Sequence, residues 1–176
     1  MKLLSGQLRL AATDVSNHLA CRHLTTLELS VAHGQRQPPE WHAPDLRIIQ
    51  QLGFDHEVRY LKALADQGLK MINLDKSSSE NAIAEATLDA MKDGIDVIAQ
   101  GVLSRGRWFG RPDVLRKVPK PSPAFGSYSY EAHDCKLARE TKATTILQLS
   151  FYSELLTEIQ GVEPDEMRVI AKSLMG

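Results

Sequence analysis

The 176-residue sequence predicts an α/β fold, in which a central mixed β-sheet is flanked by helices and preceded by a helical segment. Apolar residues follow a helical period through most of residues 1–68, whereas residues 69–176 alternate strand-like and helix-like runs. Hydrophobic residues make up 43% and charged residues 24% of the chain, an ordinary globular composition with enough length for one core. We therefore expect a single domain over 1–176, with a helical N-terminal part at 1–68 and a sheet-containing core at 69–176.

The helical part is expected to contain two helices. The first begins near Thr13 or Asp14, either of which could cap it, and Val15, Leu19 and Leu24 follow at roughly helical spacing. Residues 33–44 hold three prolines and one glycine, which is typical of a surface loop. A second helix is predicted over residues 45–67, or two shorter ones if Gly53 interrupts it. Its expected core contacts are Leu46, Ile49, Leu52, Val58, Leu61 and Leu64.

The core part is expected to alternate strands and helices. Residues 69–74 resemble a short strand, and the S-x-x-E pattern at 77–80 predicts a capping box before a helix that reaches Asp93 and ends at Gly94. Strands are predicted at 97–103 and 107–118, joined by a hairpin loop at 104–106. The remaining expectations are a proline-rich loop at 119–126, a strand at 127–137, a helix at 142–160 stopped by Gly161 and Pro164, and a strand at 167–170.

Composition excludes several classes of protein and site. The two cysteines, Cys21 and Cys135, cannot supply four thiolates to a zinc or iron–sulfur site within one chain. The N-terminus lacks a secretory apolar segment, and no apolar run reaches the length of a membrane span. The net charge of −1 carries no global signal for nucleic acid, so any DNA-binding surface must be local. We expect a cytoplasmic protein with no membrane partner.

Two acids and one lysine form the chemically informative pattern. Asp134 and Lys136 lie two apart on a predicted strand and therefore project to the same side. Asp113, on a neighbouring predicted strand, could complete a small acidic pocket. Mg²⁺ is bound through one or two carboxylates plus water, and a lysine in reach could orient that water or neutralise developing negative charge. This set suffices for metal-assisted phosphodiester hydrolysis.

Each short pattern also has decoys in the chain. Another [DE]-x-K occurs at residues 140–142, and Pro-Asp occurs again at 44–45 and 164–165. The alternative for Asp134 and Lys136 is an exposed strand-edge ion pair, worth under about 1 kcal/mol. The order of the patterns favours the site, because Pro-Asp on one strand precedes Asp-x-Lys on a later strand and an amphipathic helix follows.

Five ordered matches carry a family resemblance: residues 12–14 together with 21–24, residues 53–57, each of the two acidic strands, and the Q-x-x-x-Y pattern of Gln148 and Tyr152. With them the chain resembles the RecB-like family of PD-(D/E)XK nucleases, including the related CRISPR-associated exonucleases. The resemblance implies a restriction-endonuclease-like core and a Mg²⁺ or Mn²⁺ cofactor. It also implies catalytic roles for Asp113, Asp134, Lys136, Gln148 and Tyr152.

The resemblance adds His56 as a metal ligand beside Asp113 and Asp134. The alternative for His56 is a solvated helix residue between two acids. Glu57 points about 100° further round the helix, so we expect it beside the ligands rather than on the same ion. Gln148 and Tyr152 share one helical face, and their alternative role is core packing.

The iron–sulfur members of the family carry one cysteine near the N-terminus and three beyond the Q-x-x-x-Y helix. No cysteine follows Lys136 here, so no iron–sulfur cluster is expected. Cys21 is expected to be a small buried residue of the first helix, and Cys135 a packing residue. The end of the chain, just after a predicted strand, is compatible with a truncated product or with a stand-alone short form.

A basic segment leads into the predicted site. Between residues 105 and 120 there are six basic residues and one acid, with Trp108 and Phe109 among them. Such a segment suits backbone contacts and base stacking, and we expect Arg107, Arg111 and Trp108 to contact DNA. The alternative is a solvated strand face with one of the aromatic residues in the core.

The predicted function is a Mg²⁺- or Mn²⁺-dependent deoxyribonuclease, compatible with DNA repair or defence. Exo- and endonucleolytic cleavage are not distinguished, nor is the strandedness of the DNA. One alternative is a non-catalytic DNA-binding or docking module that acts with a helicase or another subunit of a nuclease complex. A second alternative is a metal-dependent hydrolase of small phosphate esters, which could use the same ligands.

Overall fold

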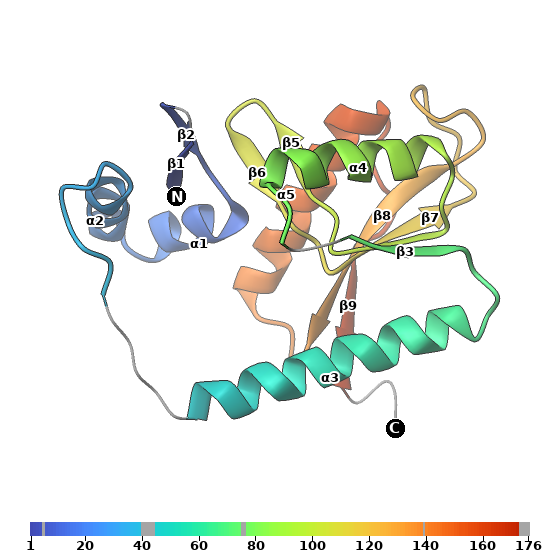
Figure 1. Cartoon of the computed structure of the whole chain (residues 1–176), viewed down its shortest axis with the longest axis horizontal. Coiled ribbons are helices and arrows are strands. Elements are labelled where there is room, and N and C mark those ends of the chain that lie inside the picture. Colours follow the sequence, from blue (N-terminus) through green and yellow to red (C-terminus); the bar gives the residue numbers. More distant parts are fainter. Residues whose placement is uncertain (5, 40–44, 75–76, 139, 173–176) are drawn as a thin grey trace.

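The computed structural model describes residues 1–4, 6–39, 45–74, 77–138 and 140–172. Its centre is a five-stranded sheet of order β3-β4-β7-β8-β9 (Figure 1). β3 is parallel to β4, β7 is antiparallel to both β4 and β8, and β9 is parallel to β8, so the predicted mixed sheet is confirmed. The strands span Met71–Asn73 (β3), Val97–Ala99 (β4), Val114–Val118 (β7), Ser129–Lys136 (β8) and Arg168–Ala171 (β9).

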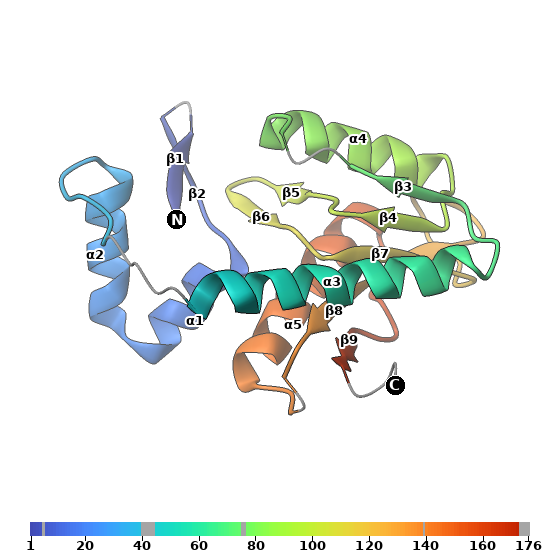
Figure 2. The ribbon, with the colours of Figure 1, turned by 60° about the horizontal axis from the view of Figure 1, so that its bottom comes forward.

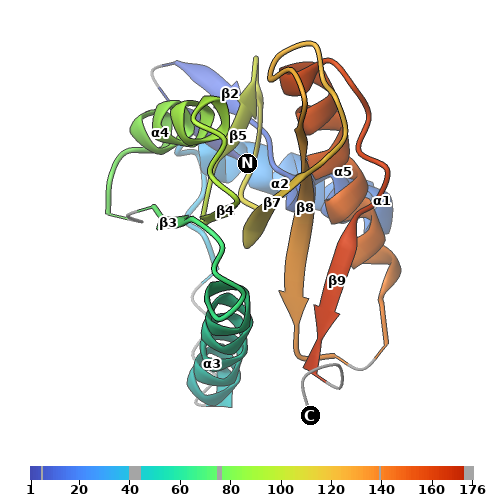
Figure 3. The same cartoon turned by 90° about the vertical axis from the view of Figure 1, so that its right-hand side faces the viewer.

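Helices cover both faces of this sheet. Leu115 and Tyr130 belong to the main core, to which α4 (Glu80–Lys92) and α5 (Ala143–Gln160) contribute their buried faces. Val114, one residue from Leu115, instead packs with Leu64 of α3 (Asp45–Ala65). Neighbouring strand residues thus point to opposite faces, and the sheet is sandwiched between α3 and the α4–α5 layer. Figure 3 shows α5 beside β8 and β9, apart from α3.

Local sequence signals set the ends of two helices. The hydroxyl of Ser79 accepts a hydrogen bond from the Ala82 amide, so Ser79 caps α4. The prediction of a capping box starting at Ser77 is therefore wrong by two residues. Gly94 (φ +66°) and Gly161 (φ +77°) adopt left-handed backbone after α4 and α5, as glycine does readily at helix C-termini.

The helix α3 is continuous through Gly53, so the alternative of two shorter helices is wrong. Leu64 is buried and Leu61 is partly buried, as predicted, but three other expected core contacts, Ile49, Leu52 and Val58, are exposed. For Ile49 and Leu52, Figure 2 shows the reason: the N-terminal half of α3 extends toward α1 (Ala12–Ala20) and α2 (Arg22–Ala32), away from the strands. The side chain of Leu46 lies outside the described part of the chain.

Both long predicted strands are broken in two. The first gives β4 and then β5 (Leu103–Arg105), and the second gives β6 (Trp108–Gly110) and then β7. β5 and β6 form a separate hairpin with its turn at Gly106 and Arg107. The first break lies at Gln100, whose φ of +57° interrupts the extended chain. A left-handed backbone at a residue other than glycine costs on the order of 1 kcal/mol or more.

The N-terminal part contains an unpredicted hairpin and two helices where one was expected. β1 (Lys2–Leu4) pairs with β2 (Gln7–Arg9), and α1 (Ala12–Ala20) is followed by α2 (Arg22–Ala32). Strands of three residues are too short for a period-two pattern to show in the sequence. Leu10 extends the β5–β6 hairpin, since its amide donates to Arg107 O (2.8 Å) and its carbonyl accepts from Phe109 N (2.9 Å).

The structure corrects the prediction for Cys21 and describes only part of the predicted loop at 33–44. Cys21 lies between α1 and α2 with its residue exposed, so its expected burial within a helix is wrong. Residues 33–39 of the predicted loop contain no helix or strand, and residues 40–44 lie outside the described residues. Of the helices in the described ranges, none combines the length and the apolar character needed to cross a lipid bilayer.

Candidate active site

The strand register brings the two aspartates of the predicted site together. Val114 of β7 lies opposite His133 of β8, so continuing this antiparallel register by one residue places Asp113 opposite Asp134. On the other side of β7, the amide of Gln100 donates to the Asp113 carbonyl at 3.0 Å. The carboxylates of Asp113 and Asp134 therefore lie side by side across the sheet. Asp113, just before β7, is flanked by β4 on one side and β8 on the other.

Asp134 is buried on the face that α5 covers. It is 1% exposed, and the Lys136 Nζ lies 2.6 Å from its Oδ2. Oδ2 therefore has one ionic neighbour, the Lys136 ammonium. Gln148 Nε2 lies 3.4 Å from Oδ1, at the long end of a hydrogen bond. Burial is the largest influence on the pKa of Asp134 and raises it, while Lys136 opposes that rise.

A short chain of hydrogen bonds connects Asp134 to the backbone before β7. Gln148 Nε2 also donates to Tyr152 Oη (2.7 Å), and this hydroxyl donates to the Arg111 carbonyl (3.2 Å). Gly110 allows the close approach, because a Cβ built there would lie 2.6 Å from two carbons of the Tyr152 ring. The structure thus gives Gln148 and Tyr152 contacts with the site that core packing alone would not require.

The Asp113 carboxylate is fixed by a hydrogen bond, and its surroundings raise its pKa. Its Oδ2 accepts a hydrogen bond from the Cys135 amide at 2.7 Å. Burial and then the charge of Asp134 raise the pKa of Asp113 from 3.8 to about 6, with a smaller contribution from Glu57 and a partial offset from Lys136. Several negative charges with one neighbouring ammonium form an arrangement that a divalent cation would stabilise.

The acid on α3 that acts on Asp113 is Glu57. Its Oε1 accepts a hydrogen bond from Gln100 Nε2. Burial, and then the charges of Asp113 and Glu57, raise the pKa of the Cys135 thiol. His56 is 1% exposed and lies against β9, where its Nε2 donates to the Ile170 carbonyl at 2.7 Å. The His56 Nδ1 is buried and has no hydrogen-bond partner among the described residues.

Sequence reasoning did not single out Gln100 as part of the site. The available signal is a Gln-Gly pair in the middle of an apolar, strand-like run, where glycine often marks a bend. The sequence also placed Glu57 behind His56 in importance. The structure brings together Asp113, Asp134, Lys136, Gln148, Tyr152 and Glu57.

The donor set fits a hard divalent cation. Carboxylate oxygens are the ligands that Mg²⁺ prefers, and one or two suffice because it keeps several waters. Asp113 and Asp134 share one neighbouring ammonium, that of Lys136, and the raised pKa of Asp113 indicates that their negative charge is incompletely compensated. Within the described ranges, no three His, Cys, Asp or Glu side chains are grouped tightly enough to hold a metal by themselves. Two aspartates completed by water match this geometry.

Two of the six basic residues near the site lack protein partners. Four of the six bind acceptors of this chain: Arg105 pairs with Glu158, Lys117 with Asp96 and Lys120 with Asp165, and Arg116 donates to two backbone carbonyls. The guanidinium groups of Arg107 and Arg111 make no hydrogen bond or ion pair within the part of the chain that the structure describes.

Trp108 is 38% exposed and packs edge-to-face on Phe151 of α5, with ring centroids 5.7 Å apart. Phe109 is half-buried beneath the charged ends of Lys2 and Arg9. Neither ring lies in the main core, so the alternative of a core aromatic at one of these positions is not supported.

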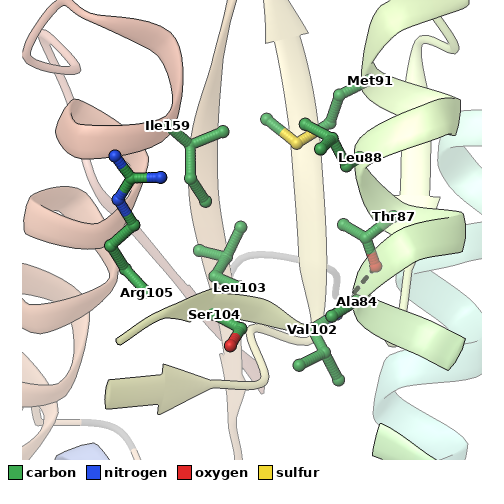
Figure 4. A pocket seen from close by; sticks show the side chains of 9 residues that line it. All are labelled: Ala84, Thr87, Leu88, Met91, Val102, Leu103, Ser104, Arg105 and Ile159. Carbon is green, nitrogen blue, oxygen red and sulfur yellow. Dashed lines mark hydrogen bonds between the residues drawn. The ribbon is translucent and has the colours of Figure 1, made fainter. Parts of the chain in front are cut away.

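Concave regions of the described chain lie away from the aspartates. The pocket in Figure 4 encloses about 150 Å³ between α4, β5 and α5, and its lining is mainly apolar, with Leu88, Met91 and Ile159 pointing inward. A larger one of about 450 Å³ lies between α3 and the far face of β7, β8 and β9. Neither is lined by Asp113, Asp134 or Lys136, so we base the candidate site on the charged groups and not on pocket shape.

Comparison with known proteins gives no relative. A scan against protein-family models, a search of curated proteins and a search of solved structures each return no match to this chain. The family resemblance drawn from the motifs therefore stays a prediction.

Proposed function

We propose that this chain is a Mg²⁺- or Mn²⁺-dependent deoxyribonuclease with a restriction-endonuclease-like core. The observation that carries the proposal is a pair of carboxylates in cross-strand register, the half-buried Asp113 and the buried Asp134, with the Lys136 ammonium on the second. Buried acids of like charge are costly unless a cation or a proton compensates them. A metal-dependent phosphodiesterase needs such acids and a lysine at one place.

Asp113 and Asp134 are the proposed ligands of the cation, and Glu57 on α3 is the proposed acceptor for a water that completes its coordination. A bound divalent cation lowers the pKa of water and stabilises negative charge on a phosphate. The bond from His56 Nε2 to Ile170 does not exclude this histidine, because metal-binding histidines usually donate their other ring nitrogen to such an acceptor, and the buried Nδ1 has no hydrogen-bond partner among the described residues. His56 therefore stays a proposed ligand from α3, while Glu57 is the acid of that helix whose charge reaches Asp113.

The protein's own groups would position the reactants. In hydrolysis, the oxygen of water forms a bond to phosphorus, and the bond from phosphorus to the leaving sugar oxygen breaks. A proton lost by the water is taken up by that sugar oxygen. Lys136, held at Asp134, is placed to orient the water or to offset the charge that develops on the phosphate. Gln148 and Tyr152 hold Asp134 and the backbone at Arg111 in a fixed relation.

DNA would approach from the side of the β5–β6 hairpin. Arg107 and Arg111 have no acceptors within the described chain, so they are available for phosphates. The exposed ring of Trp108 is available for stacking on a base. These contacts carry no base-specific readout, which agrees with a nuclease that is not directed to one sequence.

A cleavage assay with matched lysine variants tests the proposal. The protein is incubated with single- and double-stranded DNA in Mg²⁺ or Mn²⁺, alongside Lys136→Ala and the control Lys142→Ala. Both lysines belong to an acid-x-Lys pattern, but Lys142 is exposed at the start of α5 and makes no side-chain cap. We expect cleavage by the wild type and the control, and a loss of at least about 100-fold in Lys136→Ala, the scale of a lost charge-stabilising group.

The assay also separates the alternatives. Equal cleavage by Lys136→Ala and the wild type would refute the assignment of the site. Metal-independent DNA binding without cleavage by the wild type would favour a docking module of a larger nuclease–helicase assembly. Hydrolysis of a small phosphate ester without cleavage of DNA would favour a metal-dependent hydrolase of small phosphate esters.

A further inference from the structure

Gln100 has an unusual backbone at the end of β4. In the described part of the chain it is the one residue other than glycine with positive φ, at +57°, and it is only 5% exposed. Asparagine and aspartate tolerate this conformation better than glutamine does, and glycine adopts it freely. Such backbone conformations persist when the surroundings hold them, and they concentrate at functional sites.

Neighbouring contacts hold this turn from both sides. The Gln100 amide donates to the Asp113 carbonyl, so its backbone is tied to the residue that precedes β7. At the adjacent Gly101, an added Cβ would lie 3.1 Å from the Thr87 side chain. The Thr87 hydroxyl accepts from the Val102 amide at 2.9 Å and donates to the Ile83 carbonyl at 2.7 Å. These bonds fix the chain path at 100–102, with the Gln100 side chain turned toward α3.

The Gln100 side chain makes one specific contact, the donation from its Nε2 to Glu57 Oε1. An amide donor orients a carboxylate without neutralising it, whereas a lysine or arginine here would pair with its charge. One glutamate oxygen is thereby fixed, and the carboxylate keeps its charge. A residue bonded to Asp113 through its backbone and to Glu57 through its side chain sets the spacing between these two acids.

We propose that Gln100 is a positioning residue that holds Glu57 near Asp113, so that Glu57 accepts a hydrogen bond from a water on the divalent cation that the two aspartates bind. This inference rests on the proposed function, because it assigns a supporting acid and the residue that orients it within the same metal site. It explains why a strained turn carries a glutamine side chain where glycine would relieve the strain.

The test separates metal affinity from stability in Gln100→Gly. Glycine accepts φ of +57° without strain, so we expect the urea midpoint of this variant to equal or exceed that of the wild type. Its affinity for Mn²⁺, measured by calorimetry with the metal alone, should fall about 10- to 100-fold, the range seen when a group supporting a metal ligand is lost. Glu57→Gln should lose a similar factor, and the double variant should lose no more than Glu57→Gln alone.

Gln160→Asn is the matched control, since Gln160 is also buried and its side chain bonds to the Tyr130 backbone. We expect it to lower the urea midpoint and leave Mn²⁺ affinity unchanged. Unchanged Mn²⁺ affinity in Gln100→Gly, or additive losses in the double variant, would overturn the role of Gln100 while leaving the nuclease proposal intact. Absence of both Mn²⁺ binding and DNA cleavage in the wild type would overturn the proposed function, and this inference with it.

Discussion

Replacing Asp113 by asparagine should stabilise the metal-free protein at neutral pH. Burial and Asp134 raise the pKa of Asp113 from 3.8 to about 6, so the folded state binds this proton more tightly than the unfolded chain does. The stability from this group is therefore fully present below about pH 4 and is lost as pH rises through 6. One pKa unit corresponds to about 1.36 kcal/mol, so the ionised carboxylate costs the fold about 3 kcal/mol at pH 7.5.

The Asp113→Asn variant removes the charge and retains an oxygen that can accept from the Cys135 amide. We expect its free energy of unfolding in EDTA at pH 7.5 to exceed that of the wild type by about 2–3 kcal/mol, and the difference to shrink toward zero near pH 4. Urea denaturation followed by far-UV circular dichroism at both pH values measures this difference. Addition of Mn²⁺ at pH 7.5 should then stabilise the wild type and leave the variant nearly unchanged.

Asp165→Asn provides the control, because this aspartate also follows a proline but is exposed and paired with Lys120. Its effect should stay within about 0.5 kcal/mol at both pH values, as for most surface ion pairs. The reasoning is refuted if Asp113→Asn is less stable than the wild type at pH 7.5, or if the difference between the two proteins does not depend on pH.

Two further predictions concern packing and the DNA surface. Gly110→Ala should lower the free energy of unfolding by about 1–3 kcal/mol and reduce cleavage, because the new Cβ would overlap the Tyr152 ring. Gly53→Ala, whose new Cβ would have no neighbouring atom within 4 Å, should raise the free energy of unfolding by about 0.5–1 kcal/mol. Equal urea midpoints for the two variants would contradict this prediction. Arg107→Ala should reduce the slope of log affinity for DNA against log salt by about 1, while Lys117→Ala, whose ammonium is bound to Asp96, should not; identical slopes for both would remove Arg107 from the DNA surface.

Much of the fold could be predicted because its signals are local. Gly94 and Gly161 end helices through their own backbone freedom, and the prolines at 119–123 exclude a strand within a few residues. The errors arose where burial depends on distant elements. The apolar residues in the first half of α3 have helical spacing, but whether they are covered depends on how far the sheet extends beneath them.

In the candidate site, too, local periodicity predicts some contacts and tertiary packing decides the others. Strand periodicity alone places Asp134 and Lys136 on one side, and helical periodicity places Gln148 and Tyr152 on one face, and the structure shows both pairs in contact. The sequence did not indicate that Glu57 rather than His56 acts on Asp113, because adjacent helix residues differ only in direction. That direction is set by the packing of α3, which buries His56 against Ile170 of β9.

The sequence by itself determined the identity of the acids and the lysine, the mixed α/β class and most element ends, because these depend on residue chemistry and short-range periodicity. Only the tertiary structure decided that Asp113 lies opposite Asp134 and that Gln100 joins Glu57 to them. These pairings depend on the register of β4, β7 and β8. That register is set by the burial of Val97, Val114 and Leu115 against elements far away in the chain, which no local pattern records.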